Sequence, residues 1–365
     1  MSSSVLKEAD RVMTICNACR YCEGFCAVFP AMELRRTFTD QDLKFFANLC
    51  HNCRGCYYAC QYAPPHSFDM NVPRALGELR LETYQAFSWP AALKGLLANN
   101  GLVVGLIAAL SVALVTLVTL LLAGHAAFFG AHTGPGSFYR VLPYWAMVLP
   151  FSALGLFILF SLGKGVVNLW RDTGGPALTR GDLAVFGRAA WDILRLRYLE
   201  GGGEGCNYPD ERFSMARRYF HHAAFYGFML CFAATCLAFF YDHALGRPAP
   251  YPLWSWPVML GTVGGLALLA GTGGMLYLKR RMDRAPASAE GFGMDIAFTA
   301  LLFLTSLTGL LLLAFRETTA MGTLLAIHLG CVLGFFITMP YGKFLHAVYR
   351  AAALVRHARE QSEAR

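Results

Sequence analysis

Beyond residue 100, the chain is dominated by six long apolar runs that carry no Lys, Arg, Asp or Glu. Each run has about 20 residues or more, which is the length that a helix needs to cross a hydrocarbon core of roughly 30 Å. The expected membrane spans are residues 101–123, 141–163, 219–241, 253–278, 296–315 and 320–342. This pattern predicts a six-helix transmembrane bundle.

Residues 1–87 contain no run of that length and are expected to form a separate domain of short helices. Thr39 or Asp40 is a suitable N-cap for a helix that contains Leu43 and ends near Leu49. Val72–Tyr84 is expected to form another helix. The pattern therefore predicts a soluble, helical N-terminal domain ahead of the membrane domain.

The basic residues are distributed unevenly between the loops of a chain whose net charge is +8. Residues 164–218, residues 279–295 and the segment from Lys343 onward hold many of them, whereas the remaining three loops hold one each: Arg140, Arg247 and Arg316. Cytoplasmic loops carry the excess of Lys and Arg in membrane proteins. We therefore expect a bacterial inner-membrane protein with both termini in the cytoplasm. Nucleic-acid binding is not expected, because the charge is spread over loops at one membrane face.

Eight of the twelve cysteines fall in two runs of the form C-x2-C-x2-C-x3-C. This is the ligand spacing of proteins that hold two [4Fe–4S] clusters, where the fourth cysteine of each run usually binds the other cluster. Zinc is disfavoured because its sites typically use two separated C-x2-4-C pairs. Disulfides are disfavoured because we expect no signal peptide and a cytoplasmic surrounding. The predicted ligands are Cys16, Cys19, Cys22, Cys26, Cys50, Cys53, Cys56 and Cys60.

These observations predict an all-α protein with a ferredoxin-like N-terminal domain that holds two [4Fe–4S] clusters, followed by the six-helix bundle. We expect the cluster domain at residues 1–87, the membrane domain at residues 88–356 and a polar tail at residues 357–365. A cytoplasmic insertion at residues 164–218 contains an amphipathic stretch, Asp182–Leu199. Among the other cysteines, Cys231, Cys236 and Cys331 are expected to pack as apolar residues, whereas Cys206 stays open as a ligand.

The histidines in the membrane domain are candidate haem ligands, because ionisable residues inside a bilayer are costly and usually functional. His328 and His346 are 18 residues apart, which in one continuous helix is five turns and about 27 Å. In the predicted span at residues 219–241, His221 and His222 lie at the inner end, and His243 lies just past the outer end. The implied pairs are His221 or His222 with His346, and His243 with His328.

Two b-type haems would follow from these pairs, with His125 as a competitor for the outer site. The alternative is that each histidine is only a hydrogen-bonded core or headgroup residue. The candidate haem-binding residues are His221, His222, His243, His328 and His346.

Four segments carry a resemblance to a known family: the cysteine runs, Arg217–Thr235, Phe298–Gly309 and Ala326–Tyr349. Together they resemble the tricarballylate- and citrate-utilisation protein B family. The resemblance implies a membrane electron-transfer protein with two iron–sulfur clusters and haem. It further implies that the protein reoxidises the flavin of a partner dehydrogenase, which converts tricarballylate to cis-aconitate, and reduces the quinone pool.

One departure from the pattern weakens the cross-ligation expected for the clusters. Bacterial two-cluster ferredoxins commonly have proline after the fourth cysteine, whereas here Ala27 and Gln61 occupy these positions. The 18-residue histidine spacing is also locally similar to that of the di-haem subunits of respiratory nitrate reductase.

The predicted function is a relay, an oxidoreductase component that takes electrons from an FAD-dependent dehydrogenase on the cytoplasmic side and passes them to a membrane quinone. Candidate quinone residues are Tyr341, Lys343, Arg217 and Arg218. A haem-free tether from cluster to quinone and a cluster-based redox sensor remain alternatives. A redox-linked transporter is disfavoured, since Asp295, at the start of a span, is the one acidic residue near a predicted span that could serve it.

Overall fold

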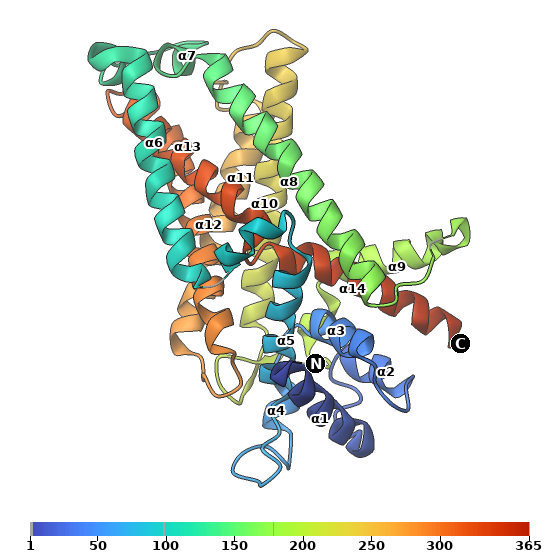
Figure 1. Ribbon diagram of the computed structural model, residues 1–365. Helices are drawn as coiled ribbons and strands as arrows, with labels where there is room; N and C mark the ends of the chain where they lie inside the picture. Colours follow the sequence, from blue (N-terminus) through green and yellow to red (C-terminus); the bar gives the residue numbers. More distant parts are fainter. Residues whose placement is uncertain (1–2, 98, 178, 365) are drawn as a thin grey trace.

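The computed structural model describes residues 3–97, 99–177 and 179–364, and most of these residues are helical (Figure 1). The N-terminal domain is built from five short helices. Thr39 and Asp42 form a capping box at the start of α3, as expected for an N-cap at Thr39. The expected helix at Val72–Tyr84 is confirmed and extends to Phe87. The helices are α1 (Ser4–Cys19), α2 (Val28–Glu33), α3 (Asp40–Leu49), α4 (Gly55–Tyr58) and α5 (Val72–Phe87).

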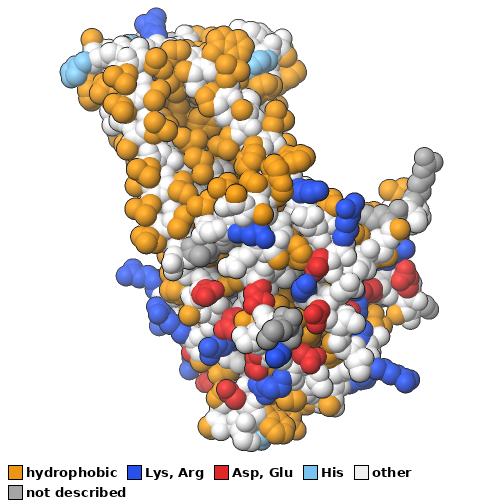
Figure 2. Space-filling view, viewed as in Figure 1, with side chains coloured by type: hydrophobic (Ala, Val, Ile, Leu, Met, Phe, Trp, Pro, Cys, Tyr) orange, Lys and Arg blue, Asp and Glu red, His pale blue; other side chains and the backbone are white. Residues whose placement is uncertain are grey.

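Six further helices are long and apolar enough to cross a membrane, and each overlaps one predicted span. Their outward side chains are exposed and apolar, as with Leu102 at 67% and Leu121 at 73% exposure. In Figure 2 hydrophobic side chains cover the upper part of the molecule, while most charged side chains lie below it. The helices are α6 (Asn100–Phe128), α8 (Tyr144–Asp172), α10 (Ala216–His243), α11 (Trp256–Arg281), α12 (Ala289–Phe315) and α13 (Met321–Thr338).

Helices α10 and α11 pack closely because glycines line their interface. A Cβ atom at Gly227, Gly264 or Gly271 would collide with atoms of the facing helix. Small residues allow helix backbones to approach in a membrane, where apolar burial gives no advantage over lipid. The contact fixes the position of α10, which carries His221.

The last span does not continue to His346, so the expectation of one helix with both histidines on one face was wrong. Helix α13 ends at Thr338, a 3₁₀ turn η4 (Met339–Tyr341) follows, and α14 (Leu345–Glu363) begins as a separate helix. Pro340 has no backbone N–H to donate into the preceding turn, and Gly342 has an extended backbone. Figure 1 shows α14 leaving the bundle toward the C-terminus. The spacing in sequence therefore does not measure the separation of the two histidines.

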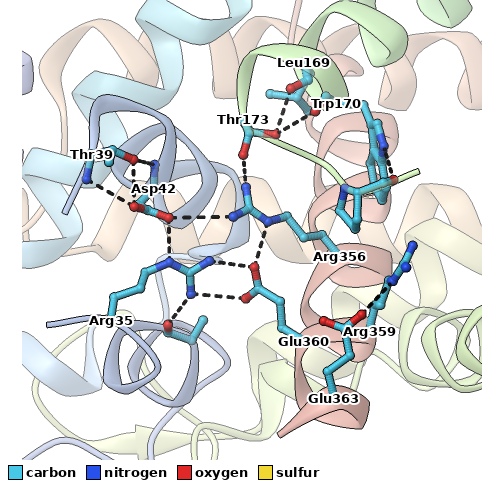
Figure 3. A network of polar contacts seen from close by, with 12 residues as sticks. Arg35, Thr39, Asp42, Leu169, Trp170, Thr173, Arg356, Arg359, Glu360 and Glu363 are labelled. Atoms are coloured by element: carbon cyan, nitrogen blue, oxygen red, sulfur yellow. Dashed lines mark hydrogen bonds and ion pairs between the residues drawn. The ribbon is translucent and has the colours of Figure 1, made fainter. Parts of the chain in front are cut away.

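The segment 357–365, expected as a polar tail, continues α14 through Glu363. An ion-pair network holds this end of the helix to the N-terminal domain (Figure 3). Arg35 lies between Asp42 at 2.5 Å and Glu360 at 2.6 Å, and Arg356 binds Glu360 at 2.8 Å. This end of the chain is ordered by partner residues that lie more than 300 positions earlier in the sequence.

The insertion at residues 164–218 begins inside α8, which runs on to Asp172. Helix α9 buries Val185 and Ala189 and exposes Leu183 at 74% and Trp191 at 59%. It is therefore amphipathic with an uncovered apolar side, as the sequence predicts. The remaining elements are η1 (Ala91–Leu97), α7 (Ser137–Val141), η2 (Arg180–Asp182), α9 (Leu183–Leu194), η3 (Arg197–Glu200), and the antiparallel strands β1 (Cys206–Asn207) and β2 (Phe213–Ser214).

Candidate functional site

The fold sorts the eight cysteines into two groups, and each group takes its fourth member from the other run. Burial raises the pKa of Cys16 to about 12, and the charges of Cys22, Cys60 and Cys19 add to the rise. Burial also raises the pKa of Cys56, with further contributions led by Cys53, Cys26 and Cys50. We call Cys16, Cys19, Cys22 and Cys60 the outer group, and Cys26, Cys50, Cys53 and Cys56 the inner group.

This grouping is the one that cross-ligation of two clusters requires. Within the described residues, no three His, Cys, Asp or Glu side chains form a site for a single metal ion. A thiol whose pKa is about 12 is protonated at neutral pH, and a coordinating metal removes that proton. The donor chemistry of both groups therefore fits iron–sulfur clusters, while the assignment of each ligand stays a prediction.

The two groups differ in their surroundings. A pocket opens onto the outer group, where Cys19 is exposed and Tyr21 is 71% exposed. In the inner group Cys50, Cys53 and Cys56 are all buried. The backbone N–H of Asn207 in strand β1 donates to the Cys53 carbonyl at 3.1 Å. The insertion thus covers the inner group on the side of the membrane domain.

His51 lies inside the second cysteine run and was not among the predicted site residues. Its side chain is 6% exposed, and neither ring nitrogen has a hydrogen-bond partner among the described residues. Burial lowers the pKa of His51 well below its ordinary value, and the charges of Arg350, Arg217 and Arg80 lower it further. A histidine between two ligand cysteines was the sequence signal that could have identified it.

Arg217 joins the inner group to the membrane helix α10. Its Nη1 donates to the Asn52 carbonyl at 2.5 Å, and its Nη2 donates to the His51 carbonyl at 2.9 Å. Both carbonyls belong to the loop between Cys50 and Cys53. His221 follows Arg217 by four residues and therefore lies on the same side of α10.

The structure brings His221 and His346 together, with ring centroids 6.2 Å apart. The Nδ1 of His346 lies 2.7 Å from the Lys343 carbonyl, which fixes a proton on Nδ1 and leaves Nε2 free. Burial lowers the pKa of His346 to about 3, so the ring is neutral and able to bind a metal. The Nδ1 of His221 is buried without a partner. This pair of donors fits a bis-histidine haem.

His222, the alternative to His221, turns away from this pair. Its Nε2 lies 3.0 Å from the Arg195 carbonyl, and its ring packs beside Tyr226. Of the two adjacent histidines, His221 is the one that faces His346.

The outer histidines are not brought together by any contact between described residues. The Nδ1 of His328 lies 3.1 Å from the Thr308 hydroxyl, whereas the exposed ring of His243 stacks on Phe239 at 3.8 Å. His125 instead packs against Phe129, with ring centroids 4.7 Å apart. The residues as placed do not form a second haem site, and the outer pair stays a prediction.

The predicted quinone residues all have protein partners. The Tyr341 hydroxyl donates to the Trp89 carbonyl at 3.0 Å, and Lys343 pairs with Asp295 at 2.6 Å. Arg218 pairs with Glu200 at 2.6 Å. Cys206 is buried next to Cys53, whose pKa its charge raises. Quinone binding and the role of Cys206 therefore stay predictions.

The chain matches two family models that together span most of its length. The model described as Citrate utilization protein B matches residues 95–365, and that described as Citrate utilization protein B Fer4-like domain matches residues 9–86. A curated relative from Escherichia coli, described as Citrate utilization protein B, is 47% identical over 356 residues, which cover 97% of this chain and 92% of the relative. No solved structure matches the chain.

Proposed function

The chain belongs to the citrate utilization protein B family, and on that premise we propose that it is the membrane electron-transfer component of a dehydrogenase system. The family description implies a role in citrate utilisation, and the Fer4-like domain indicates iron–sulfur clusters. Our proposal is that the protein reoxidises the flavin of a partner dehydrogenase for a tricarboxylate such as tricarballylate. The electrons then leave to the membrane quinone pool.

The observation that carries the proposal is a continuous series of candidate cofactor ligands from the surface to the membrane helices. The outer group is open to solvent, and the inner group lies behind it. Arg217 holds the inner loop, and the next turn of α10 carries His221, which faces His346. When bound, clusters and haem exchange single electrons, which suits a relay between flavin and quinone. The polypeptide supplies ligands, spacing and insulation from water.

We place the docking of the flavoprotein at the exposed face around the outer group. Tyr21 is 71% exposed and Phe68 is 46% exposed, and Phe68 packs against Tyr62 of the pocket that opens onto these cysteines. Exposed aromatic side chains are typical anchors of protein interfaces. The basic loops support a cytoplasmic position for this face in a bacterial inner membrane.

The test is the optical spectrum and the metal content of the protein purified in detergent. We expect about eight non-haem irons per chain, as two [4Fe–4S] clusters require, and a b-type α band on reduction. The flavoprotein should reduce this band only when its organic substrate is present. Absence of the band from well-haeminated cells would overturn the haem and favour a haem-free tether or a sensor.

A matched pair of variants locates the haem. His346→Leu should remove the α band that depends on the inner histidine pair, whereas His222→Leu should retain it, because His222 faces Arg195. Loss of the same band in both variants, or in neither, contradicts the inner pair.

A further inference from the structure

Three arginines lie near His51, which belongs to the loop of the inner cysteine group. Arg80 comes from α5, Arg217 from α10 and Arg350 from α14, and the charges of all three act on His51. We call Arg80, Arg217 and Arg350 the arginine cluster. Each is partly buried, so water screens their mutual repulsion less than at the surface.

None of the three has a carboxylate partner among the described residues. Arg217 donates to two backbone carbonyls. The Nε of Arg80 donates to the Ala47 carbonyl at 2.8 Å, while its Nη2 is buried without a partner. Arg350 makes no hydrogen bond or ion pair within the described part of the chain. Leaving such cations together and unpaired is destabilising, because an uncompensated buried charge loses its hydration without gaining a partner.

The arginines farther along α14 provide a contrast. Arg356 binds Glu360, and Arg359 binds Glu363 at 3.1 Å (Figure 3). Arg359 also binds Asp182 at 3.4 Å. The same helix therefore provides acids for its other arginines and none for Arg350. An unpaired cation beside buried, unpartnered donors indicates an anion-binding site.

The position of the site indicates which anion it takes. Arg350 follows His346 by four residues on α14, as His221 follows Arg217 on α10. Each arginine therefore lies one helical turn, about 6 Å, from one histidine of the pair. Both lie on the side toward the cysteines, since Arg217 donates to the loop between Cys50 and Cys53, and the charges of Cys50 and Cys26 act on Arg350. A ligand held by the two histidines would have its charged groups within reach of Arg350. Arg80 lies near Arg350, because its positive charge lowers the pKa of Arg350.

We propose that Arg80 and Arg350, with the ring of His51, bind the two propionate carboxylates of a haem whose iron is held by His221 and His346. This inference rests on the proposed function, which supplies the haem. Guanidinium groups bind carboxylates through two parallel hydrogen bonds, and b-type haem carries two carboxylates. Arg217 has a separate role, because it positions the loop that carries His51.

The alternative occupant is the inner iron–sulfur cluster, whose own negative charge the arginines would neutralise without contacting haem. The two occupants predict different results for the same variants. Arg350→Gln and Arg80→Gln remove one cation each, and Arg359→Gln on the same helix is the matched control. Iron and acid-labile sulfide content, with the cluster EPR signal, check that each variant is folded.

The readout is haem retention by the full-length protein in detergent, followed as the rate of haem transfer to apomyoglobin. We expect at least tenfold faster haem loss in Arg350→Gln and Arg80→Gln, with the non-haem iron content unchanged. Arg359→Gln should behave like the unmodified protein. Arg350→Lys should restore part of the retention. Normal haem retention in both glutamine variants, with only the cluster midpoint potential shifted, overturns the inference in favour of the cluster.

A modified haem identifies the interacting groups. The unmodified protein reconstituted with haem dimethyl ester, which lacks both carboxylates, should lose haem as fast as Arg350→Gln does with native haem. In Arg350→Gln the ester should make little further difference. Equal, additive effects of the ester in both proteins overturn the inference. A protein that contains clusters but never haem overturns the proposed haem itself, which is a different result from normal haem retention in the variants.

Discussion

The outer and inner cysteine groups arise from one repeated motif, yet the fold gives them different environments. Cys19 of the outer group is exposed, whereas Cys53 of the inner group is 5% exposed and hydrogen-bonded through its carbonyl to strand β1. A spacing motif thus specifies what can bind, while the tertiary contacts decide whether the site faces a soluble partner or the membrane domain.

The residue that directly follows the second cysteine of each run shows the same difference. Arg20 follows Cys19 and Arg54 follows Cys53, and both have a left-handed backbone, with φ of 54° and 70°. Arg20 is exposed, but Arg54 is 2% exposed, and its guanidinium stacks on Tyr208 at 4.6 Å. Of these two equivalent residues, Arg20 is a surface residue, whereas Arg54 connects the second run to the insertion.

The largest expected effect separates the two groups directly. Cys53→Ala should remove the inner cluster and lower the free energy of unfolding by more than about 4 kcal/mol, since metal binding there is coupled to a packed core. Cys19→Ala should remove a similar amount of iron but lower the free energy of unfolding by less than about half as much. Iron analysis and thermal unfolding in detergent measure both. Equal destabilisation would show that the groups contribute alike to the fold.

Arg54→Ala should cost about 3 kcal/mol, and Arg20→Ala less than about 0.5 kcal/mol. Arg54 loses the stacking on Tyr208 and a hydrogen bond of 2.9 Å to the Asp283 carbonyl, and leaves a cavity. Both alanines occupy a left-handed backbone, so the strain cancels in the comparison. The measurement is the change in Tm for each variant. A similar change in both would mean that Arg54 does not anchor the inner run.

The sequence predicted the helices well and the connection between two of them badly. Apolar length alone located all six spans, because a bilayer imposes that length on any crossing helix. The break at Pro340 was missed because the apolar run continues through it. The order of residues 357–363 was missed because it depends on Glu360 meeting Arg35, a contact that no local pattern encodes.

The cysteine runs were predictable because their ligands repeat at short spacing. For the histidines, the sequence predicted that His346 meets His221 or His222, and only the fold selects His221. The arginine cluster did not, because Arg80, Arg217 and Arg350 come from three helices far apart in the sequence. An arginine has the same local sequence pattern whether it faces water or a buried site.

Removal of iron by a chelator should also distinguish the groups. With an aqueous ferrous chelator and a reductant, we expect two phases, the outer cluster losing iron at least about tenfold faster, because water reaches its pocket without local unfolding. Arg54→Ala should accelerate the slow phase, and Arg20→Ala should leave it unchanged. EPR of the partly depleted protein identifies the surviving cluster. A single phase would mean that both groups are equally accessible.

The smallest expected effect concerns pH and α14, which carries Arg350 beside the inner group. His357 of this helix is 5% exposed, its Nδ1 has no partner among the described residues, and burial lowers its pKa to about 4. The unfolded chain, where the pKa of histidine is about 6.5, binds more protons between these two values. The stability that neutral His357 provides is therefore complete above pH 6.5 and decreases as the pH falls toward 4.

Between pH 7 and pH 5 this decrease should be about 1–2 kcal/mol, and it should be absent from His357→Gln. The measurement is the Tm of both proteins at the two pH values. Arg350 of α14 lies near Cys50 and Cys26 of the inner group. At pH 5 the slow chelator phase should therefore be faster in the unmodified protein than in His357→Gln. An accelerated fast phase would instead place the pH-sensitive contact at the outer group.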